Sequence, residues 1–319
     1  MASDEALELE GLPHAERVRS AKVKGGVAMV IADATGLGES ERNALEQELR
    51  SAAEATRGVS QAKVALTVSE PSRKLIAIGS GKGGVGKSTV AANLAIALAR
   101  AGHKVGLIDA DIYGPSQPTI LGTYAKPEAA DDRLIPVEAH GLRFLSLGQL
   151  VSPGHALAWR GPMATGALAR LIEADWGDCE LLLVDLPPGT GDVQLSLIQR
   201  SRPDGAVIVS TPQDLSLIDA RRAVDLFRKT GVPVLGIIEN MATYACPNCG
   251  ETSHPFGIGG AEAAAAEMGV PFLGRLPLSL AIREASDMGQ PPAVSGGAEA
   301  DAFVVLAGRL LESLETPVR

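Results

Sequence analysis

Residues 81–89 read Gly-Lys-Gly-Gly-Val-Gly-Lys-Ser-Thr, and this run constrains the fold more than any other part of the chain. It fits the phosphate-binding loop pattern G-x-x-x-x-G-K-[ST], which binds a nucleotide when it joins a buried strand to a helix. Both flanks are present, because the apolar run 75–78 precedes the loop and the Ala/Leu-rich stretch 87–101 follows it. The pattern therefore predicts a nucleoside-triphosphate site in an α/β domain.

Each position of this loop has a physical role. Its glycines allow consecutive backbone N–H groups to converge on phosphate oxygens without clashes from Cβ atoms. Lys87 would place a positive charge at the β- and γ-phosphates of ATP, and the hydroxyl of Ser88 can bind Mg²⁺. The helix that begins at Lys87 adds the positive end of its dipole. The loop residues predicted to bind nucleotide are Gly81, Lys82, Gly83, Gly84, Val85, Gly86, Lys87, Ser88 and Thr89.

Three aspartates at strand ends extend this prediction. Asp109 and Asp111 follow one buried apolar run, and Asp185 ends another. An aspartate directly after a buried strand of a P-loop protein holds Mg²⁺, either directly or through water. We expect Asp185 to have this role and Asp111 to orient or deprotonate the attacking water, while Asp109 joins the nucleotide site. The glycine-rich loop from Asp185 to Asp192 is predicted to act as a switch that senses the γ-phosphate.

From residue 74 onward, short apolar runs alternate with helical stretches. Continuous apolar strands between helices are typical of a parallel sheet that is covered on both faces. We therefore predict an α/β fold with a doubly wound, mostly parallel sheet, whose sites lie at the carboxyl ends of the strands. The expected strands are 75–78, 105–109, 181–185, 206–210 and 234–238. The expected helices are 87–101, 164–173, 215–230, 260–268 and, as a capping helix, 300–314.

Residues 1–70 are expected to form a separate small α+β unit, and residues 71–319 the P-loop domain. The expected elements of the small unit are strands 18–23, 27–32 and 62–68 and a helix 40–56. Two glycines at the turn favour a hairpin for the first two strands. Ser40 is the expected N-cap of the helix. A ββαβ unit of this size is small for an independent core.

Charge and cysteine usage exclude several classes of function. Lys and Arg total 29 against 38 Asp and Glu, which gives a formal net charge of −9. An acidic chain without a basic cluster is unsuited to nucleic acids or anionic membranes, and aromatic residues, at 3%, are too few for a base-stacking surface. No apolar run is long enough to span a bilayer. Three cysteines and the absence of signal-peptide features at residues 1–5 predict a cytoplasmic protein.

A C-x-x-C pair, Cys246 and Cys249, follows the last strong strand. Two thiolates at this spacing can bind one edge of a metal site, but zinc ions and cubane clusters usually need four ligands. The residues by themselves leave three interpretations open: an iron–sulfur cluster, zinc, or a redox-active or inert pair. His254 is close enough in sequence to be a zinc ligand, although a polar loop histidine is the simpler interpretation. Cys179, just before a buried strand, is expected to be an ordinary core thiol.

Lys82, directly after the first loop glycine, is typical of the deviant Walker A group, which includes MinD, the nitrogenase iron protein and the partition ATPases. That resemblance implies that Lys82 reaches across a dimer to the nucleotide of the partner subunit. The further characteristic segments are 109–116, 159–163, 185–192 and 238–241, the last followed by C-P-x-C-G. From about residue 74 to the C-terminus, the chain closely resembles the Mrp/ApbC family of P-loop ATPases, which bind and transfer iron–sulfur clusters.

The family resemblance implies a homodimer that carries a labile [4Fe–4S] cluster to recipient apoproteins and hydrolyses ATP slowly. Cys246 and Cys249 of two subunits would supply the four thiolates. Lys82, Lys87 and Asp111 would act in hydrolysis, and Asn240 would contact the adenine. The alternative is a regulatory switch ATPase, similar to MinD or a partition protein, whose cysteines hold zinc.

Two segments depart from this assignment of roles. Residues 26–67 resemble only the second half of the small iron–sulfur-assembly domain of many bacterial members, because the D-P-E segment and the cysteine are absent. We therefore expect a degenerate remnant that packs or docks. Residues 159–163 match the family, but the sequence assigns no chemistry to them.

Overall fold

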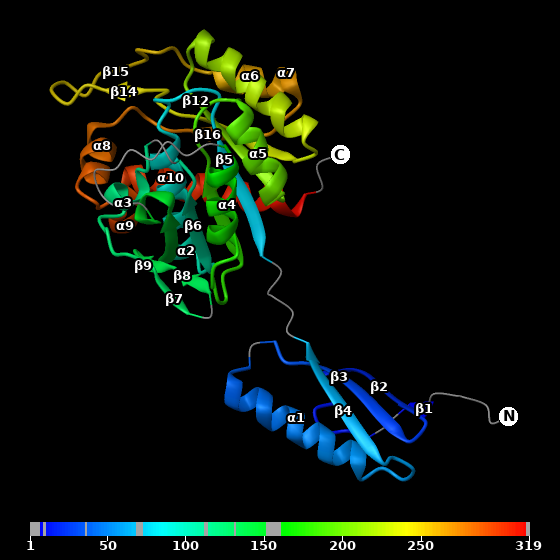
Figure 1. The fold of residues 1–319 in the computed structure, drawn as a ribbon. Coiled ribbons are helices and arrows are strands. Elements are labelled where there is room, and N and C mark those ends of the chain that lie inside the picture. Colours follow the sequence, from blue (N-terminus) through cyan, green and yellow to red (C-terminus); the bar gives the residue numbers. More distant parts are fainter. Residues whose placement is uncertain are drawn as a thin grey trace. The chain divides into compact units, whose positions relative to one another are not determined.

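A computed structural model describes residues 7–8, 11–35, 37–67, 73–111, 114–130, 132–150 and 161–316 of the chain. The chain divides into two compact units, Met1–Ser72 and Arg73–Arg319, which are described separately below (Figure 1). Among the described residues, no helix is both long and apolar enough to cross a membrane.

The first unit is a small sheet with one helix. Its elements are β1 (Leu7–Glu8), β2 (Val18–Lys24), β3 (Val27–Asp33), α1 (Glu39–Glu54) and β4 (Gln61–Thr67). The strand order is β1-β2-β3-β4, with β2 and β3 antiparallel and β3 and β4 parallel. Alternate residues of β3 are buried, as a half-covered strand requires, and they form a core with Leu45 and Leu49 of α1.

The expected N-cap of this helix is wrong. Helix α1 begins at Glu39, and its N-cap is Gly38. The carboxylate of Glu41 accepts a hydrogen bond from the backbone N–H of Gly38 at 2.8 Å. A glutamate at the third helical position satisfies the free N–H of the N-cap residue, which is the second half of a capping box. The predicted N-cap lies two residues too late in the chain, because Gly38 has no side chain that marks it as a cap.

The second unit contains an eight-stranded sheet, and the predicted α/β fold is confirmed (Figure 1). The strand order is β16-β13-β12-β5-β11-β6-β10-β9, and every pair is parallel except β10 with β9. The strands are β5 (Lys74–Gly79), β6 (Val105–Asp109), β9 (Val137–Ala139), β10 (Leu142–Ser146), β11 (Leu181–Asp185), β12 (Gly205–Ser210), β13 (Val234–Glu239) and β16 (Phe272–Arg275). Strands β9, β10 and β16 of this sheet are not among those predicted from the sequence.

Helices cover both faces of this sheet, and each face has its own core. Ile76 and Ile78 of β5 belong to one core, and Leu75 and Ala77 belong to the other, because successive side chains point to opposite faces. The first core includes α2 (Lys87–Arg100), α3 (Gln117–Ile120), α8 (Leu280–Asp287), α9 (Pro292–Ser295) and α10 (Ala298–Glu315). The second includes α4 (Gly161–Ile172), α5 (Asp192–Ser201), α6 (Asp214–Lys229) and α7 (Gly260–Met268).

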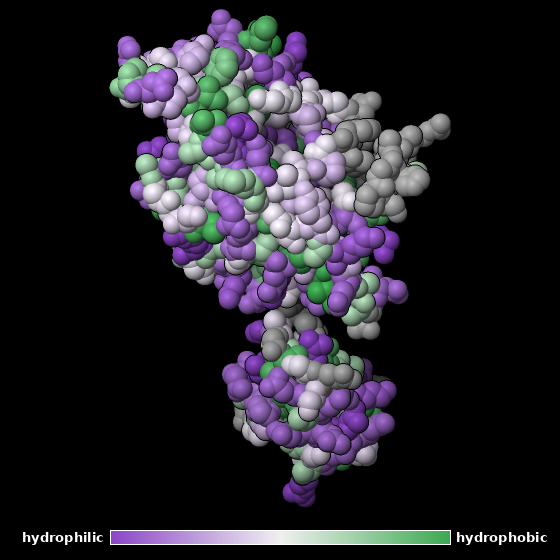
Figure 2. Space-filling view, turned by 90° about the vertical axis from the view of Figure 1, so that its left-hand side faces the viewer, coloured by the Kyte–Doolittle hydropathy of each residue, from purple (hydrophilic) through white to green (hydrophobic). Residues whose placement is uncertain are grey.

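Short elements lie outside this sheet. They are the β7–β8 hairpin (Glu128–Ala130 and Arg133–Ile135), the 3₁₀ helix η1 (Leu147–Leu150) and the β14–β15 hairpin (Tyr244–Ala245 and Thr252–Ser253). In the view of Figure 2, hydrophilic residues cover most of the surface, and apolar residues are scattered in small groups. The β14–β15 hairpin carries the cysteine pair, and it follows β13 at the same sheet edge as the phosphate-binding loop.

Candidate nucleotide site and cysteine pair

The phosphate-binding loop lies between the carboxyl end of β5 and the first turn of α2. Gly86 is the N-cap of α2 and has a left-handed backbone, with φ of 79°. A Cβ atom there would overlap the side-chain nitrogen of Asn240, so this position requires glycine for two reasons. A Cβ atom on Gly81 would overlap the backbone of Asp219 in α6. The loop is therefore packed tightly from two sides.

A pocket of about 610 Å³ opens above this loop. The predicted residues Lys82 to Thr89, Asp111 and Asn240 line it together. The remaining lining residues had no individual role predicted from the sequence, although some of them belong to the segments 109–116, 185–192 and 238–241: Pro115, Ser116, Thr119, Ile120, Pro188, Met241, Pro277, Leu278, Ser279, Ile282, Arg283, Ser286 and Asp287. The structure thus brings the phosphate-binding loop and Asp111 to one cavity, which residues of α3 and α8 also line.

Lys87 and Asp185 form an ion pair at the base of this pocket, with side chains only 6% and 0% exposed. Lys87 also donates to the hydroxyl of Ser88 at 3.4 Å. The second carboxylate oxygen of Asp185 accepts a hydrogen bond from the Gln117 amide at 2.9 Å. Hydroxyl and carboxylate oxygens are the ligands that Mg²⁺ prefers, and the Oε1 atom of Gln117 is buried without a hydrogen-bond partner. The donor set therefore fits a magnesium site.

Asp109 lies beside this pair and is fully buried. Burial, and then the negative charge of Asp185, raise the pKa of Asp109 to about 7. Its carboxylate accepts hydrogen bonds from the backbone N–H groups of Asp111 and Gln117, both at 3.1 Å, and from the Ser146 hydroxyl at 3.0 Å. Asp109 does not line the pocket, so its contact with the site runs through these neighbours.

Gln117 and Ser146 belong to this polar cluster, and neither was predicted from the sequence. Gln117 is fully buried and donates to both Asp185 and the backbone carbonyl of Ser88, at 2.9 and 3.0 Å. Ser146 ends β10, a strand that was itself not predicted. A polar residue one position beyond the 109–116 segment was the only available signal for Gln117, and nothing in the local pattern indicated its burial.

The remaining predicted nucleotide-site residues are partly placed. Lys82 is half-buried at the pocket wall, and its ammonium forms no ion pair within the described part of the chain. Asp111 accepts a hydrogen bond from the backbone N–H of Gly114 at 3.1 Å. Gly189, in the predicted switch loop, donates its backbone N–H to the carbonyl of Ser80 at 3.0 Å. Of the 159–163 segment, residues 159 and 160 lie outside the described residues, and α4 begins at Gly161.

The cysteine pair lies at the tip of the β14–β15 hairpin. The Cys246 N–H donates to the carbonyl of Glu251 at 2.9 Å, and the Gly250 N–H donates to the carbonyl of Cys246 at 2.8 Å. These two hydrogen bonds close a tight loop that begins at Cys246. Hydrogen bonds from the backbone N–H groups of Cys249 and Asn248 lower the pKa of Cys246. A thiol that loses its proton readily, on an exposed loop, is suited to bind metal.

This pair has no third protein ligand within the described residues, where no cluster of three or more His, Cys, Asp or Glu side chains is positioned to hold a metal. His254 donates from Nδ1 to the carbonyl of Ala242 at 3.0 Å, which anchors the base of the hairpin. Cys249 is exposed and Cys246 is half-buried. Two thiolates on an open loop can therefore form half of a four-sulfur site.

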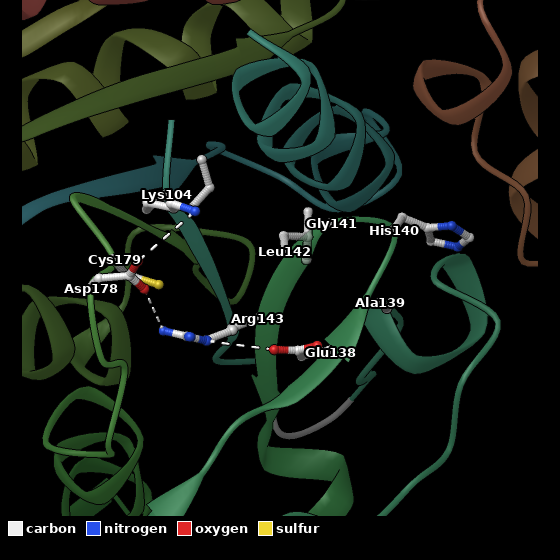
Figure 3. Close-up of a pocket in the computed structure, with 10 residues that line it drawn as sticks. Lys104, Glu138, Ala139, His140, Gly141, Leu142, Arg143, Asp178 and Cys179 are labelled. Carbon is white, nitrogen blue, oxygen red and sulfur yellow. Dashed lines mark hydrogen bonds and ion pairs between the residues drawn. The ribbon is translucent and has the colours of Figure 1, made fainter. Parts of the chain in front are cut away.

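Cys179 lies just before β11, at the amino ends of the parallel strands, whereas the cysteine pair follows the carboxyl end of β13. It lines a second pocket of about 400 Å³, in which Arg143 contacts Asp178 at 2.9 Å and Glu138 at 3.9 Å (Figure 3). Burial raises the pKa of the Cys179 thiol, and the positive charge of Arg143 opposes this effect. The thiol is 2% exposed. It is separated from the cysteine pair by the length of the strands and cannot join the same metal site.

Comparison with known proteins matches residues 72–310 to the ParA family model described as NUBPL iron-transfer P-loop NTPase. An iron–sulfur cluster carrier protein of Pseudomonas fragi is 50% identical over 70% of this chain and 79% of its own length. A protein of Arabidopsis thaliana, named iron–sulfur protein required for NADH dehydrogenase, mitochondrial, is 48% identical over 76% of this chain and 79% of its own. A carrier protein of Deinococcus radiodurans is 44% identical over 86% of this chain and 81% of its own.

Solved structures agree with these relatives. A nucleotide-binding protein from Archaeoglobus fulgidus, in complex with ADP, has a TM-score of 0.62 and 39% identity, over 71% of this chain and 89% of its own. The cell division ATPase MinD from Pyrococcus furiosus has a TM-score of 0.58 and 26% identity, over 75% and 98% of the two chains. The carrier relatives are much more similar in sequence than MinD is, so the MinD-like alternative is not favoured.

Proposed function

The chain belongs to the ParA family of NUBPL-type iron-transfer P-loop NTPases, and from this premise we propose that it binds iron–sulfur clusters and transfers them to recipient apoproteins. The observation that carries the proposal is the pairing of two features in one unit. An exposed Cys246–Cys249 loop, in which backbone N–H groups lower the pKa of Cys246, follows directly from a strand that borders the nucleotide pocket.

ATP is the proposed nucleotide. Lys87 would exchange Asp185 for the β- and γ-phosphates, because a phosphate in the loop competes for the same ammonium. Ser88 and Asp185 would hold Mg²⁺, which supplies positive charge that neutralises the phosphate oxygens. Asn240 lines the pocket next to the loop, where it would contact the adenine.

Slow hydrolysis is proposed for this site. Asp111 lines the pocket, where it would orient or deprotonate the attacking water. Lys82 would act in the partner subunit, since its ammonium forms no ion pair among the described residues of its own chain. Low turnover is sufficient for a protein that uses nucleotide as a switch rather than for flux.

A homodimer is proposed for the cluster-bound form. Cys246 and Cys249 supply two thiolates, and a [4Fe–4S] cluster takes four. A two-fold axis near the hairpin tip would bring each pair to its copy, which completes the ligand set with no additional residue type. A cluster held between two exposed loops is accessible to a recipient protein, and this property suits transfer. A cytoplasmic location stays a prediction.

The test is anaerobic reconstitution with iron and sulfide, followed by measurement of iron content and molecular mass. We expect about four irons per dimer, and a dimer that depends on the cluster. Reconstituted protein should also restore activity to an apo form of a [4Fe–4S] enzyme. A colourless protein that holds one zinc ion per cysteine pair and transfers no iron would contradict the proposal.

A further inference from the structure

Residues 239–243 lie between the nucleotide pocket and the cysteine hairpin. Asn240 donates from its side chain to the carbonyl of Val85, in the phosphate-binding loop, at 2.8 Å. The Asn240 side chain is only 9% exposed, and both Asn240 and Met241 line the pocket. Tyr244, which begins the hairpin, follows three residues after Met241. The pocket wall and the entry to the hairpin are therefore one continuous piece of backbone.

Met241 has an unfavourable backbone conformation. Its φ is 60°, in the left-handed region that a non-glycine residue with a long side chain rarely adopts. The end of its side chain lies next to Gly86, the N-cap of α2. Strained residues at such places persist only where their surroundings hold them, and they are common at switch regions. Because Met241 lines the pocket, a ligand bound there would alter the surroundings that hold this conformation.

The same segment is bonded to a second part of the pocket wall. The Leu276 N–H donates to the carbonyl of Glu239 at 2.9 Å, and the Ala242 N–H donates to the carbonyl of Leu276 at 3.0 Å. The Leu278 N–H donates to the carbonyl of Thr243 at 2.7 Å. Leu278 lines the pocket. The segment that leads into the hairpin is thus held between the phosphate-binding loop on one side and a pocket-lining segment on the other.

The chain beyond the hairpin also returns to this segment, because His254, directly after β15, donates to the carbonyl of Ala242 at 3.0 Å, and Glu239 holds the start of α7. This carboxylate is fully buried, and it accepts hydrogen bonds from the backbone N–H groups of Gly259 at 3.0 Å and Ala261 at 2.7 Å. Arg275 donates to it at 3.1 Å and also pairs with Glu262 of α7. A buried carboxylate with several N–H donors is a rigid anchor, because breaking any of these bonds leaves a buried charge poorly compensated.

We propose that residues 239–243 couple the nucleotide pocket to the cysteine pair, with Met241 as the residue that responds to occupancy and Glu239 as the positioning residue for the hairpin. Both ends of the hairpin are fixed to this segment, so a shift of Met241 changes the distance between the two cysteine pairs of a dimer. Nucleotide would thereby alter how firmly the cluster is held. This inference rests on the proposed carrier function, which requires both ligands.

The test measures the rate at which a chelator removes the cluster from the reconstituted full-length protein. The rate is followed by visible absorbance without nucleotide, with saturating Mg-ADP and with saturating Mg-ATP. Nucleotide affinity is measured separately by calorimetry for each variant, so that saturation is known. In the wild type we expect nucleotide to change the rate by about fivefold or more, a typical size for coupling between sites.

Two variants and two matched controls isolate the segment. Met241→Gly keeps the backbone, because glycine adopts φ of 60° without strain, and it removes the contact with the pocket. Its control, Asp132→Gly, replaces another left-handed residue in the exposed β7–β8 turn. Glu239→Gln weakens the anchor at Gly259, whereas its control, Glu262→Gln, removes an exposed partner of the same Arg275.

We expect Met241→Gly and Glu239→Gln to bring the ratio of the cluster-removal rates with and without nucleotide close to one. Both controls should keep the wild-type ratio. Wild-type ratios in Met241→Gly and Glu239→Gln would overturn the inference. A wild type that binds both ligands but shows no nucleotide effect would overturn the coupling and leave the carrier function intact. A wild type that binds no cluster would overturn the proposed function itself, and the inference with it.

Discussion

Lys87 and Asp185 are 98 residues apart in the chain, yet their side chains form a buried ion pair beneath the nucleotide pocket. The pair joins the residue proposed to bind phosphate with the residue proposed to hold Mg²⁺. A phosphate that takes Lys87 from Asp185 leaves a buried carboxylate without its cation, which is costly unless another cation replaces it. Nucleotide and magnesium should therefore bind this site cooperatively.

Removing the ammonium tests this relationship. Lys87→Ala should weaken Mg-ATP binding by about 10–100-fold, because a charged hydrogen bond contributes about 1.5–3 kcal/mol. Calorimetric titration with ATP, with and without Mg²⁺, measures the effect. The control is Lys74→Ala, which removes an exposed lysine of β5 whose partner is Asp204. Equal ATP affinities in both variants would contradict the assigned role.

Lys82→Ala should affect hydrolysis more than binding. If the lysine contributes to the site of the partner subunit, its loss should lower kcat by about 10²-fold or more, with a small change in ATP affinity. Mixed dimers of Lys82→Ala and Lys87→Ala subunits provide a second measurement. One of the two sites in such a dimer would have both lysines intact and should hydrolyse ATP. Inactive mixed dimers would show that Lys82 acts within its own chain.

Replacement of Cys246 or Cys249 by Ala should abolish cluster binding and cluster-dependent dimerisation, because two subunits would then supply only two thiolates. ATP binding should change little. The control is Cys179→Ala, because the buried Cys179 thiol lies at the amino ends of the strands, away from the cysteine pair. Iron content and dimer mass of the three reconstituted variants decide the matter. About four irons per dimer in Cys246→Ala would exclude the shared-cluster arrangement.

The raised pKa of Asp109 predicts how stability depends on pH. The folded chain holds this proton from pH 3.8 to about 7, whereas an unfolded chain releases it near pH 3.8. The contribution of Asp109 to stability is therefore fully present below pH 3.8 and is lost as the pH rises through about 7. In metal-free buffer, Asp109→Asn should flatten the fall in Tm between these limits. A wild-type and a variant curve of equal slope would contradict the assignment.

The N-terminal unit should be dispensable for the chemistry of the second unit. It contains no cysteine, and the unit Arg73–Arg319 has its own two cores. A chain that begins at Pro71 should fold, bind ATP and accept a cluster, as measured by circular dichroism, calorimetry and iron content. A folded truncated protein that binds ATP but cannot hold a cluster would show that the first unit contributes to cluster binding.

Much of the fold follows from local patterns. The five expected strands of the P-loop domain are all present, because buried parallel strands leave continuous apolar runs that are visible in the sequence. The short strands β9 and β16 were not predicted, because they lack such a continuous buried run. β9 is exposed or half-buried along its length, and β16 has only two buried residues. Such edge strands carry no pattern that distinguishes them from loops.

The sequence by itself determined the phosphate-binding loop, the strand-end aspartates and the cysteine pair, because each depends on residues that are adjacent in the chain. Only the tertiary structure decided that Gln117 bonds to Asp185, that Ser146 bonds to Asp109, and that Glu239 holds the start of α7 beyond the cysteine hairpin. These contacts join separate elements that meet only when the sheet forms. A buried polar side chain needs a hydrogen-bond partner, and residues adjacent in the chain do not indicate which distant residue that partner is.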